Sequence, residues 1–252
     1  MSYLIAITGK GGVGKTTISA LLVKQLIANG KSPVLAIDAD PNSCLDAALG
    51  VTVNQTVGRA REEVREEAAA AAANGISKQE MLEMKISESL VEAQGFDLIA
   101  MGRPEGSGCY CYANNVLNSV IQQISGEYPY VVLDNEAGLE NLSRRIVQKV
   151  DVLILVSDAS NAGLNTLERL HELAVEMNIS YSKLFLIINR SRSGSLPSRT
   201  SEIKARTGAD QVILLPDDGQ IAEFAENSKN LLSLPDGNTV LQSIDKLVKE
   251  ID

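Results

Sequence analysis

The residues from Gly9 to Thr16 have the types and spacing of a phosphate-binding loop. They read Gly-Lys-Gly-Gly-Val-Gly-Lys-Thr, which fits the pattern G-x-x-x-x-G-K-S/T at every position. Glycines allow the backbone N–H groups to curl around a phosphate, and a following helix directs its positive end at the same anion. In this pattern Lys15 reaches the β- and γ-phosphates, and the Thr16 hydroxyl ligates Mg²⁺. The sequence therefore predicts a site for a nucleoside triphosphate.

An acid at the end of a later apolar run would complete this site. The run Tyr130–Asp134 is apolar up to its last residue. An aspartate so placed holds Mg²⁺ in sites of this kind, and we expect Asp134 to do so through a water molecule. Gly138, four residues further on, is free to turn toward the γ-phosphate.

Short apolar runs alternate with helical patterns along the whole chain, and these are the elements that must position the site. The candidate strands are Tyr3–Thr8, Pro33–Asp38, Phe96–Ala100, Tyr130–Asp134, Val152–Ser157, Leu184–Asn189 and Gln211–Leu215. Most are continuously apolar, as expected of strands buried on both faces of a parallel sheet. The candidate helices include Lys15–Ala28, Val116–Ser125, Asn165–Met177 and Ala222–Asn227. This alternation predicts an α/β fold with a doubly wound, mainly parallel sheet flanked by helices.

The length and composition fit one domain. The chain has 252 residues, of which 44% are apolar, and we expect residues 1–252 to form a single unit. Residues 55–95 differ, because an acidic and alanine-rich stretch ends at Asn74 and Gly75. A second helical pattern starts at Ser77, with Glu80 in the capping-box position, and runs to about Val91. We expect a helical insertion there.

The composition argues against several classes of protein. The chain has 23 basic and 32 acidic residues, a net charge of −9, which argues against a surface for nucleic acid or anionic membrane. Its one histidine, His171, nearly excludes catalytic triads and multi-histidine metal sites. Three cysteines are too few for a disulfide scaffold and suit a reducing compartment. Because no apolar run approaches the ~20 residues of a spanning helix, we expect a cytoplasmic protein.

A second lysine, Lys10, follows the first glycine of the loop. The run from Lys10 to Thr17 resembles the deviant Walker A motif of the MinD, ParA and nitrogenase iron protein class of P-loop ATPases. The resemblance implies ATP contacts at Gly11, Gly12, Val13, Gly14, Lys15, Thr16 and Thr17. It also implies a homodimer in which Lys10 crosses to the partner's nucleotide and acts, with Lys15, on the developing phosphate charge.

Other positions carry over by the same resemblance. Asp40 matches the position that orients the attacking water, and Asp38 matches a supporting position near the Mg²⁺. Asn189 would contact the adenine, and Pro216 lies where the class frames the base with backbone. Arginines occupy the second and fourth places of the guanine-reading Asn-Lys-x-Asp motif, which favours ATP over GTP. The class often has threonine directly after the acid that matches Asp134, so Asn135 and Glu136 are departures from its pattern, and their effect stays open.

Cys109 and Cys111 form a Cys-x-Cys pair in a glycine-rich loop. Two sulfurs cannot close a four-coordinate site, but two chains meeting at this loop would supply enough thiolates for tetrahedral Zn²⁺ or square-planar Ni²⁺. Taken alone, a Cys-x-Cys pair is weak evidence for a metal site. Reduced buried thiols or a redox pair are the alternative. The dimer that the Lys10 motif implies favours the shared metal site. The third thiol, Cys44, is interpreted as a small buried hydrophobe.

Four segments together resemble one branch of the class, the CooC-type ATPases that assist nickel insertion into carbon monoxide dehydrogenase. They are Gly9–Thr17, Asp38–Leu45, Met101–Asn115 and Asp134–Leu142, and the third is the most specific. The resemblance implies that the paired cysteines of two protomers share one Ni²⁺ (or Zn²⁺), and that the nucleotide state controls the dimer. It implies carbon monoxide dehydrogenase as the client, with acetyl-CoA synthase maturation as the alternative.

Two other functions are alternatives to this one. An electron-transfer ATPase like the nitrogenase iron protein shares a 4Fe–4S cluster between chains, but its cysteines come from well-separated segments rather than one Cys-x-Cys. A positioning module that assembles on DNA or membrane needs a basic face or a lipid-seeking tail. The net charge of −9 and the mixed charges of the last helical pattern, residues 240–251, supply neither. We therefore expect no nucleic-acid and no membrane partner.

Overall fold

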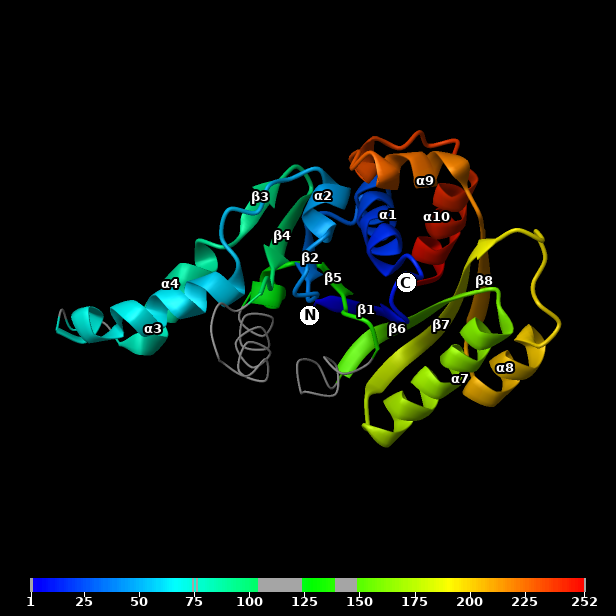
Figure 1. Cartoon of the computed structure of the whole chain (residues 1–252), viewed down its shortest axis with the longest axis horizontal. Helices are drawn as coiled ribbons and strands as arrows, with labels where there is room; N and C mark the ends of the chain where they lie inside the picture. Colours follow the sequence, from blue (N-terminus) through cyan, green and yellow to red (C-terminus); the bar gives the residue numbers. More distant parts are fainter. Residues whose placement is uncertain (1, 74, 76, 104–123, 139–148, 252) are drawn as a thin grey trace.

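The computed structural model describes residues 2–73, 75, 77–103, 124–138 and 149–251. In these residues a sheet of eight strands has the order β3-β4-β2-β5-β1-β6-β7-β8 (Figure 1). The strands are β1 (Tyr3–Gly9), β2 (Val34–Asp38), β3 (Val91–Ala93), β4 (Phe96–Ala100), β5 (Tyr130–Asp134), β6 (Lys149–Asp158), β7 (Ser180–Ser191) and β8 (Gln211–Pro216). Neighbouring strands are parallel except β3 and β4. The predicted doubly wound, mainly parallel α/β fold is confirmed.

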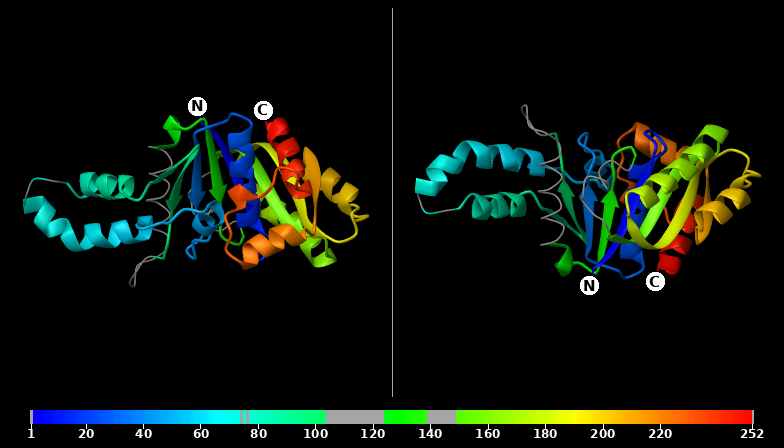
Figure 2. Two further views of the ribbon diagram at one scale, coloured as in Figure 1. Left: turned by 90° about the horizontal axis from the view of Figure 1, so that it is seen from above. Right: turned by 90° about the horizontal axis from the view of Figure 1, so that it is seen from below.

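Helices pack on both faces of this sheet. The helices of the described residues include α1 (Lys15–Ala28), α2 (Leu45–Leu49), α3 (Val57–Ala73), α4 (Lys78–Ser87), α7 (Asn161–Glu176), α8 (Thr200–Thr207), α9 (Gly219–Glu226) and α10 (Thr239–Ile251). α1 and α10 cover one face, and α7 and α8 cover the other (Figure 1, Figure 2). Successive side chains of a strand alternate between the two cores, so Ile5 and Ile7 pack with α1 and α10 while Ala6 packs with the opposite cluster.

Two neighbouring strands, β6 and β7, are longer than their apolar runs predicted. β6 was expected over Val152–Ser157 and β7 over Leu184–Asn189, but their pairing begins at Lys149 opposite Ser180. At these ends the exposed Lys149 and Ser180 are followed by Val150 and Tyr181, which pack in the core. Because polar and apolar residues alternate there, no continuous apolar run marks these ends.

Three helices also depart from the predicted limits. α7 begins at Asn161 rather than Asn165, because the Ser160 hydroxyl accepts a hydrogen bond from Gly163 N at 3.0 Å and caps the helix. α9 likewise begins at Gly219, after the cap Asp218. α8 has no predicted counterpart. The predicted helix Val116–Ser125 falls almost entirely outside the described residues.

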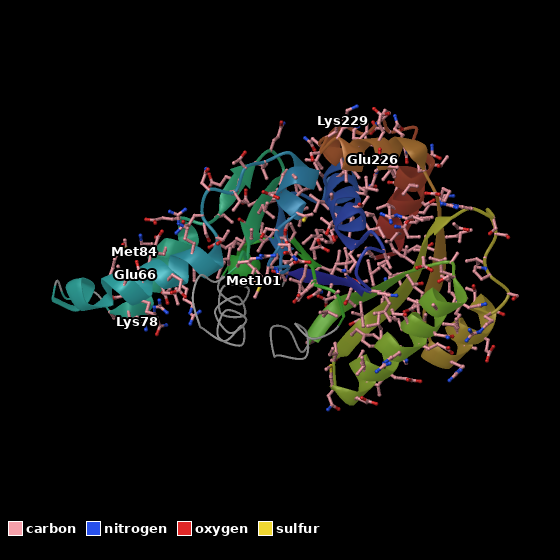
Figure 3. All side chains as sticks on the ribbon, in the orientation of Figure 1. Glu66, Lys78, Met84, Met101, Glu226 and Lys229 are labelled. Carbon is pink, nitrogen blue, oxygen red and sulfur yellow. The ribbon has the colours of Figure 1, made fainter. Side chains whose placement is uncertain are left out.

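The predicted helical insertion is a hairpin of α3 and α4 that projects from the β4 side of the sheet (Figure 2). Its capping box is confirmed, because Glu80 N donates to Ser77 Oγ at 3.2 Å and Ser77 N donates to Glu80 Oε2 at 2.8 Å. An ion pair of 2.9 Å between Lys85 and Glu63 joins the two helices. Figure 3 shows Met84 on the hairpin and Met101 at its base.

The second helix of the hairpin ends earlier than predicted. α4 stops at Ser87, and residues near Val91 form β3, which pairs antiparallel with β4. A two-residue turn joins these strands, with Gly95 at a φ of 85°. The β-hairpin therefore takes residues that the periodicity had assigned to a helix.

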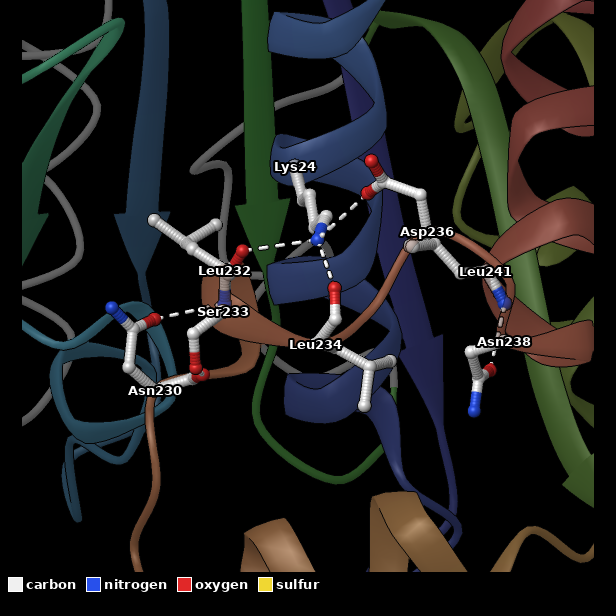
Figure 4. A network of polar contacts seen from close by, with 8 residues as sticks. All are labelled: Lys24, Asn230, Leu232, Ser233, Leu234, Asp236, Asn238 and Leu241. Carbon is white, nitrogen blue, oxygen red and sulfur yellow. Dashed lines mark hydrogen bonds and ion pairs between the residues drawn. The ribbon is translucent and has the colours of Figure 1, made fainter.

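Lys24 fastens the loop between α9 and α10 to the helix that follows the phosphate-binding loop (Figure 4). Its Nζ donates to the carbonyls of Leu232, at 3.0 Å, and Leu234, and it pairs with Asp236 at 3.3 Å. Within the described ranges, every helix is too short or too polar to cross a membrane.

Candidate nucleotide site

The phosphate-binding loop lies between the end of β1 and the start of α1, in the middle of the sheet. Gly14 precedes the helix with a φ of 93°, and a Cβ there would lie 2.6 Å from Asn189 Nδ2. Only glycine meets both conditions without strain. The first turn of α1 has no side-chain cap and no acidic residue. Its N–H groups and its positive dipole end are therefore available to an anion.

Two residues of β7 support this loop. The Asn189 amide donates to the Val13 carbonyl at 2.8 Å, and the Arg190 guanidinium donates to the Gly12 carbonyl at 3.0 Å. Asn189 is buried, and its Oδ1 accepts from the backbone N–H of Arg190 at 2.9 Å. Asn189 thus braces the loop, while its contact with adenine stays a prediction.

Lys15 is a buried cation, with 7% of its surface exposed, and its Nζ lies 3.5 Å from the carbonyl oxygen of Lys10. Burial lowers the pKa of the Lys15 amine, against the raising effect of Asp134, Asp40 and Glu136. A charged amine that is desolvated in this way is strongly stabilised by a polyanion such as a triphosphate. Lys10 is exposed, which leaves its side chain accessible to a second chain.

Asp134 ends β5 beside this loop and is 1% exposed. Its Oδ1 accepts from Ser19 Oγ at 3.0 Å, but its buried Oδ2 has no hydrogen-bond partner among the described residues. Burial raises the pKa of Asp134 to about 6, against the lowering effect of the Thr16 and Ser19 hydroxyls. A buried carboxylate oxygen without a partner, next to a threonine hydroxyl, suits a hard divalent cation. Thr16 and Asp134 therefore fit Mg²⁺, which would neutralise phosphate charge there.

Asp38 organises the loop that follows β2. Its Oδ1 accepts from Asp40 N at 3.0 Å, and its Oδ2 accepts from Cys44 N and Leu45 N at 2.9 Å each. Burial and the neighbouring Asp134 raise the pKa of Asp38 to about 7. The two acids are register partners on β2 and β5. Asp38 thus lies next to Asp134, which fits Mg²⁺, but both of its oxygens accept hydrogen bonds from the loop, and its supporting role near the metal stays a prediction.

Cys44 is exposed, so the prediction of a buried hydrophobe was wrong. It lies at the N-cap of α2, where its backbone N–H, and not its thiol, donates a hydrogen bond to Asp38. Partial burial and the nearby carboxylates, first among them Asp38, raise the pKa of the thiol.

The residues after β5 are bound to β1. Asn135 donates to the carbonyl of Ile7 through its backbone N, at 3.1 Å, and through its Nδ2, at 3.0 Å. Gly138 N donates to the carbonyl of Gly9 at 3.0 Å. The role of Asn135, left open by the sequence, is therefore a brace between two strand ends. Its buried Oδ1 has no partner within the described ranges.

A cavity of about 870 Å³ opens beside the loop. The predicted nucleotide contacts Thr17, Asn189 and Pro216 line it. Its wall near Pro216 is fixed through Asp218, whose carboxylate accepts from Asn238 Nδ2 at 3.0 Å. A cavity of this size, next to a helix N-terminus, can hold a base and ribose.

The sequence comparisons agree with this geometry. A family model, AAA_31, described as an AAA domain, matches residues 2–184. The chain belongs to this family of ParA/MinD-type P-loop ATPases. The AAA_31 ATPase is 40% identical to an uncharacterized ATP-binding protein of Methanocaldococcus jannaschii, with 98% of each chain covered. It is 32% identical to the carbon monoxide dehydrogenase accessory protein CooC of Rhodospirillum rubrum, over 69% of its own length and 70% of that protein.

Solved structures have the same fold as this AAA_31 ATPase. The septum site-determining protein MinD of Pyrococcus horikoshii, complexed with Mg-ADP, superposes with a TM-score of 0.71 at 21% identity, covering 100% of this chain and 96% of that one. A ParA family ATPase of Chlorobium tepidum superposes with a TM-score of 0.73 at 19% identity, covering 100% and 99%.

The predicted thiolate site of this AAA_31 ATPase is not tested, because Cys109 and Cys111 lie outside the described residues. The part of the chain that the structure describes holds no cluster of three or more histidine, cysteine or acidic side chains arranged to bind a metal ion.

Two residues of the ATPase site, Ser19 and Arg190, were not predicted to contribute to it. Ser19 lies one helical turn after Lys15, and this spacing could have indicated that its hydroxyl faces Asp134. Arg190 adopts a φ of 54°, which carries its side chain to the loop. No sequence signal marks a positive φ at an arginine.

Proposed function

We propose that this ATPase is a Mg-ATP-dependent metallochaperone that works as a homodimer. It binds one Ni²⁺ through Cys109 and Cys111 of two chains and assists nickel insertion into carbon monoxide dehydrogenase. The supporting observation is a Cys-x-Cys pair in a chain that is 32% identical to a protein named as a carbon monoxide dehydrogenase accessory protein.

The chemistry is hydrolysis of ATP by water to ADP and phosphate. Lys15 and the N–H groups of the loop bind the β- and γ-phosphates, and Thr16 and Asp134 hold the Mg²⁺ that neutralises their charge. Asp40 accepts a hydrogen bond from the attacking water and aligns it with the γ-phosphorus. The geometry supporting this is the buried, partnerless Asp134 Oδ2 beside a desolvated Lys15.

In this proposal the dimer couples ATP hydrolysis to metal binding. The exposed Lys10 would reach the nucleotide of the second chain, so ATP closes the dimer and brings two Cys-x-Cys pairs together. Loss of the γ-phosphate relaxes the closed form and changes the metal affinity, because the two equilibria are linked. The predicted location of this cycle is the cytoplasm.

Other metals and other client enzymes are alternatives to Ni²⁺ and carbon monoxide dehydrogenase. Thiolates bind Zn²⁺ as well as Ni²⁺, and a related maturation ATPase would serve acetyl-CoA synthase instead. An electron-transfer ATPase would share a 4Fe–4S cluster, which would give the anaerobically purified protein a brown colour and visible absorption.

The test is Ni²⁺ binding to the reduced full-length protein under anaerobic conditions, with the mass of the complex measured in parallel. We expect one ion per two chains, bound to a dimer and lost in the Cys109→Ser/Cys111→Ser double variant. Cys44→Ser is the matched control and should bind as wild type. Binding that survives the double substitution, or no binding by a chain that hydrolyses ATP, would overturn the metallochaperone role.

A second assay addresses the client. Nickel-free carbon monoxide dehydrogenase incubated with the Ni²⁺-loaded protein and Mg-ATP should recover activity faster than with Ni²⁺ alone. Equal rates, or activation of acetyl-CoA synthase in its place, would exclude the proposed client.

A further inference from the structure

The carboxylate of Asp40 is held by a chain of hydrogen bonds that ends at Arg103. Asp40 Oδ1 accepts from Asn42 N at 2.8 Å and from Asn42 Nδ2 at 2.9 Å. Asn42 Oδ1 in turn accepts from Arg103 Nη2. Asp40 and Asn42 follow β2 whereas Arg103 follows β4, so only the tertiary structure brings Arg103 to the other two side chains.

The backbone that carries Arg103 is fixed on two sides. Met101 N donates to the carbonyl of Asp38 at 2.8 Å, and the carbonyl of Met101 accepts from Gly58 N, at the start of α3, at 2.9 Å. Gly102 has a φ of 64°, and a Cβ there would lie 2.5 Å from a side-chain oxygen at the base of the hairpin. The exposed Arg103 guanidinium therefore projects from a rigid base.

We propose that Asn42 and Arg103 are positioning residues for Asp40 in ATP hydrolysis. This inference rests on the proposed function, in which Asp40 orients the attacking water. The two donors of Asn42 both engage Oδ1 of Asp40. No described residue donates a hydrogen bond to Oδ2, so this oxygen is left to accept from the water.

Arg103 acts on Asp40 through the amide of Asn42. An amide side chain can rotate to exchange its oxygen and nitrogen, and only the nitrogen can donate to a carboxylate. The guanidinium binds the amide oxygen, so it fixes the orientation in which Nδ2 faces Asp40. Its charge also polarises the amide and strengthens that N–H donor. Without Arg103, Asn42 can turn its oxygen toward Asp40 and displace the carboxylate.

The test compares steady-state hydrolysis and ATP affinity of the full chain in four variants. Arg103→Met and Asn42→Ala should lower kcat about tenfold, with KM for ATP changed less than about twofold, because each loses a hydrogen bond that acts on a charged group. Arg103→Lys should restore most of the rate, since an ammonium can donate to the same amide oxygen. Arg206→Met removes an exposed arginine paired with Glu168 at 2.8 Å, away from the site, and should match wild type.

A double-mutant cycle with Asp40→Asn separates positioning from a structural effect. In the Asp40→Asn background, Arg103→Met should change the residual rate less than about twofold, because its effect passes through the carboxylate. Equal losses in both backgrounds, or a wild-type kcat in Arg103→Met, would overturn the positioning role and leave the proposed function standing. A wild-type chain that binds ATP without hydrolysing it would overturn the proposed function, and this inference with it.

Discussion

The side-chain amide of Asn189 donates a hydrogen bond to the carbonyl of Val13 over 2.8 Å, which ties the end of β7 to the phosphate-binding loop. Removing this brace should loosen the loop and leave the Val13 carbonyl without its partner. We expect Asn189→Ala to weaken ATP binding by roughly tenfold, because the free energy lost is about that of one buried hydrogen bond and the loop becomes less ordered. Titration with a fluorescent ATP analogue measures this.

Asn29→Ala is the matched control for this prediction. Asn29 also donates its amide to a backbone carbonyl, that of Gln25 at 2.8 Å, but it does so at the far end of α1. Equal ATP affinities in the two variants would mean that the loop keeps its shape without Asn189.

Gly14 should tolerate no side chain. Gly14→Ala combines a left-handed φ of 93° with a Cβ 2.6 Å from Asn189 Nδ2. We expect loss of detectable ATP binding, because the helix N-terminus must shift away from the phosphates. Gly30→Ala is the control, since it has a φ of 73° but no atom within 4 Å of the added Cβ. It should cost only about 1 kcal/mol of stability, from backbone strain, and keep ATP affinity. ATP binding by Gly14→Ala would contradict the close packing described.

The metal-free protein should become less stable as the pH rises. The pKa values of Asp38 and Asp134 are raised from 3.8 to about 7 and about 6. The folded state therefore binds more protons than the unfolded state in this window, so the free energy of unfolding falls as pH rises from roughly 4 to 7. We expect the urea midpoint in EDTA to fall across that range, and Mg-ATP to stabilise the protein most at its upper end.

Other groups act in the opposite direction. Hydrogen bonds lower the pKa values of Glu63, Glu80, Asp158 and Asp245, whose effect is confined to the acid end of the series. Burial lowers the pKa of His171, which also acts in the opposite direction, so the series is measured in His171→Gln. In that background Asp134→Asn should make the profile less steep and leave the part that the buried Asp38 contributes. A urea midpoint independent of pH in EDTA would show that the two acids are not desolvated as described.

The two lysines of the loop should separate binding from dimerisation. Lys15→Ala removes the buried amine, and we expect ATP affinity to fall by about a hundredfold, the scale of losing a desolvated charge on phosphate. Lys10→Ala removes an exposed amine and should bind ATP within about twofold of wild type, but fail to dimerise or hydrolyse it. Mass measurements with a non-hydrolysable ATP analogue distinguish these. An ATP-dependent dimer formed by Lys10→Ala would exclude its proposed role across the interface.

Lys24 should contribute to stability through the carbonyls that it binds rather than through its ion pair. Lys24→Met removes both hydrogen bonds from Nζ to carbonyls of the loop before α10, at a cost of about 1–2 kcal/mol. Lys249→Met removes only an exposed i,i+4 pair with Asp245 and should cost about 0.3–0.5 kcal/mol. Urea unfolding of both variants tests this, and equal costs would contradict the role of the carbonyl contacts.

Local sequence was enough to indicate much of the site and the capping box of α4. The pattern that ends in Lys15 and Thr16 is contiguous, and the Ser77 and Glu80 interaction spans one turn of helix, so each could be recognised from neighbouring residues. The limits of β6 and β7 could not, because their polar ends are held by partner strands far away in the sequence.

Sequence by itself determined the class of fold and the type of chemistry, because apolar runs, glycines and lysine spacing act over a few residues. Only the tertiary structure decided how Asn189 braces Val13, how Asp38 and Asp134 meet on adjacent strands, and how Arg103 reaches Asn42. These contacts join residues that are distant along the chain, and the order of strands in the sheet fixes them. A pattern of neighbouring residues does not specify the order of the strands in the sheet.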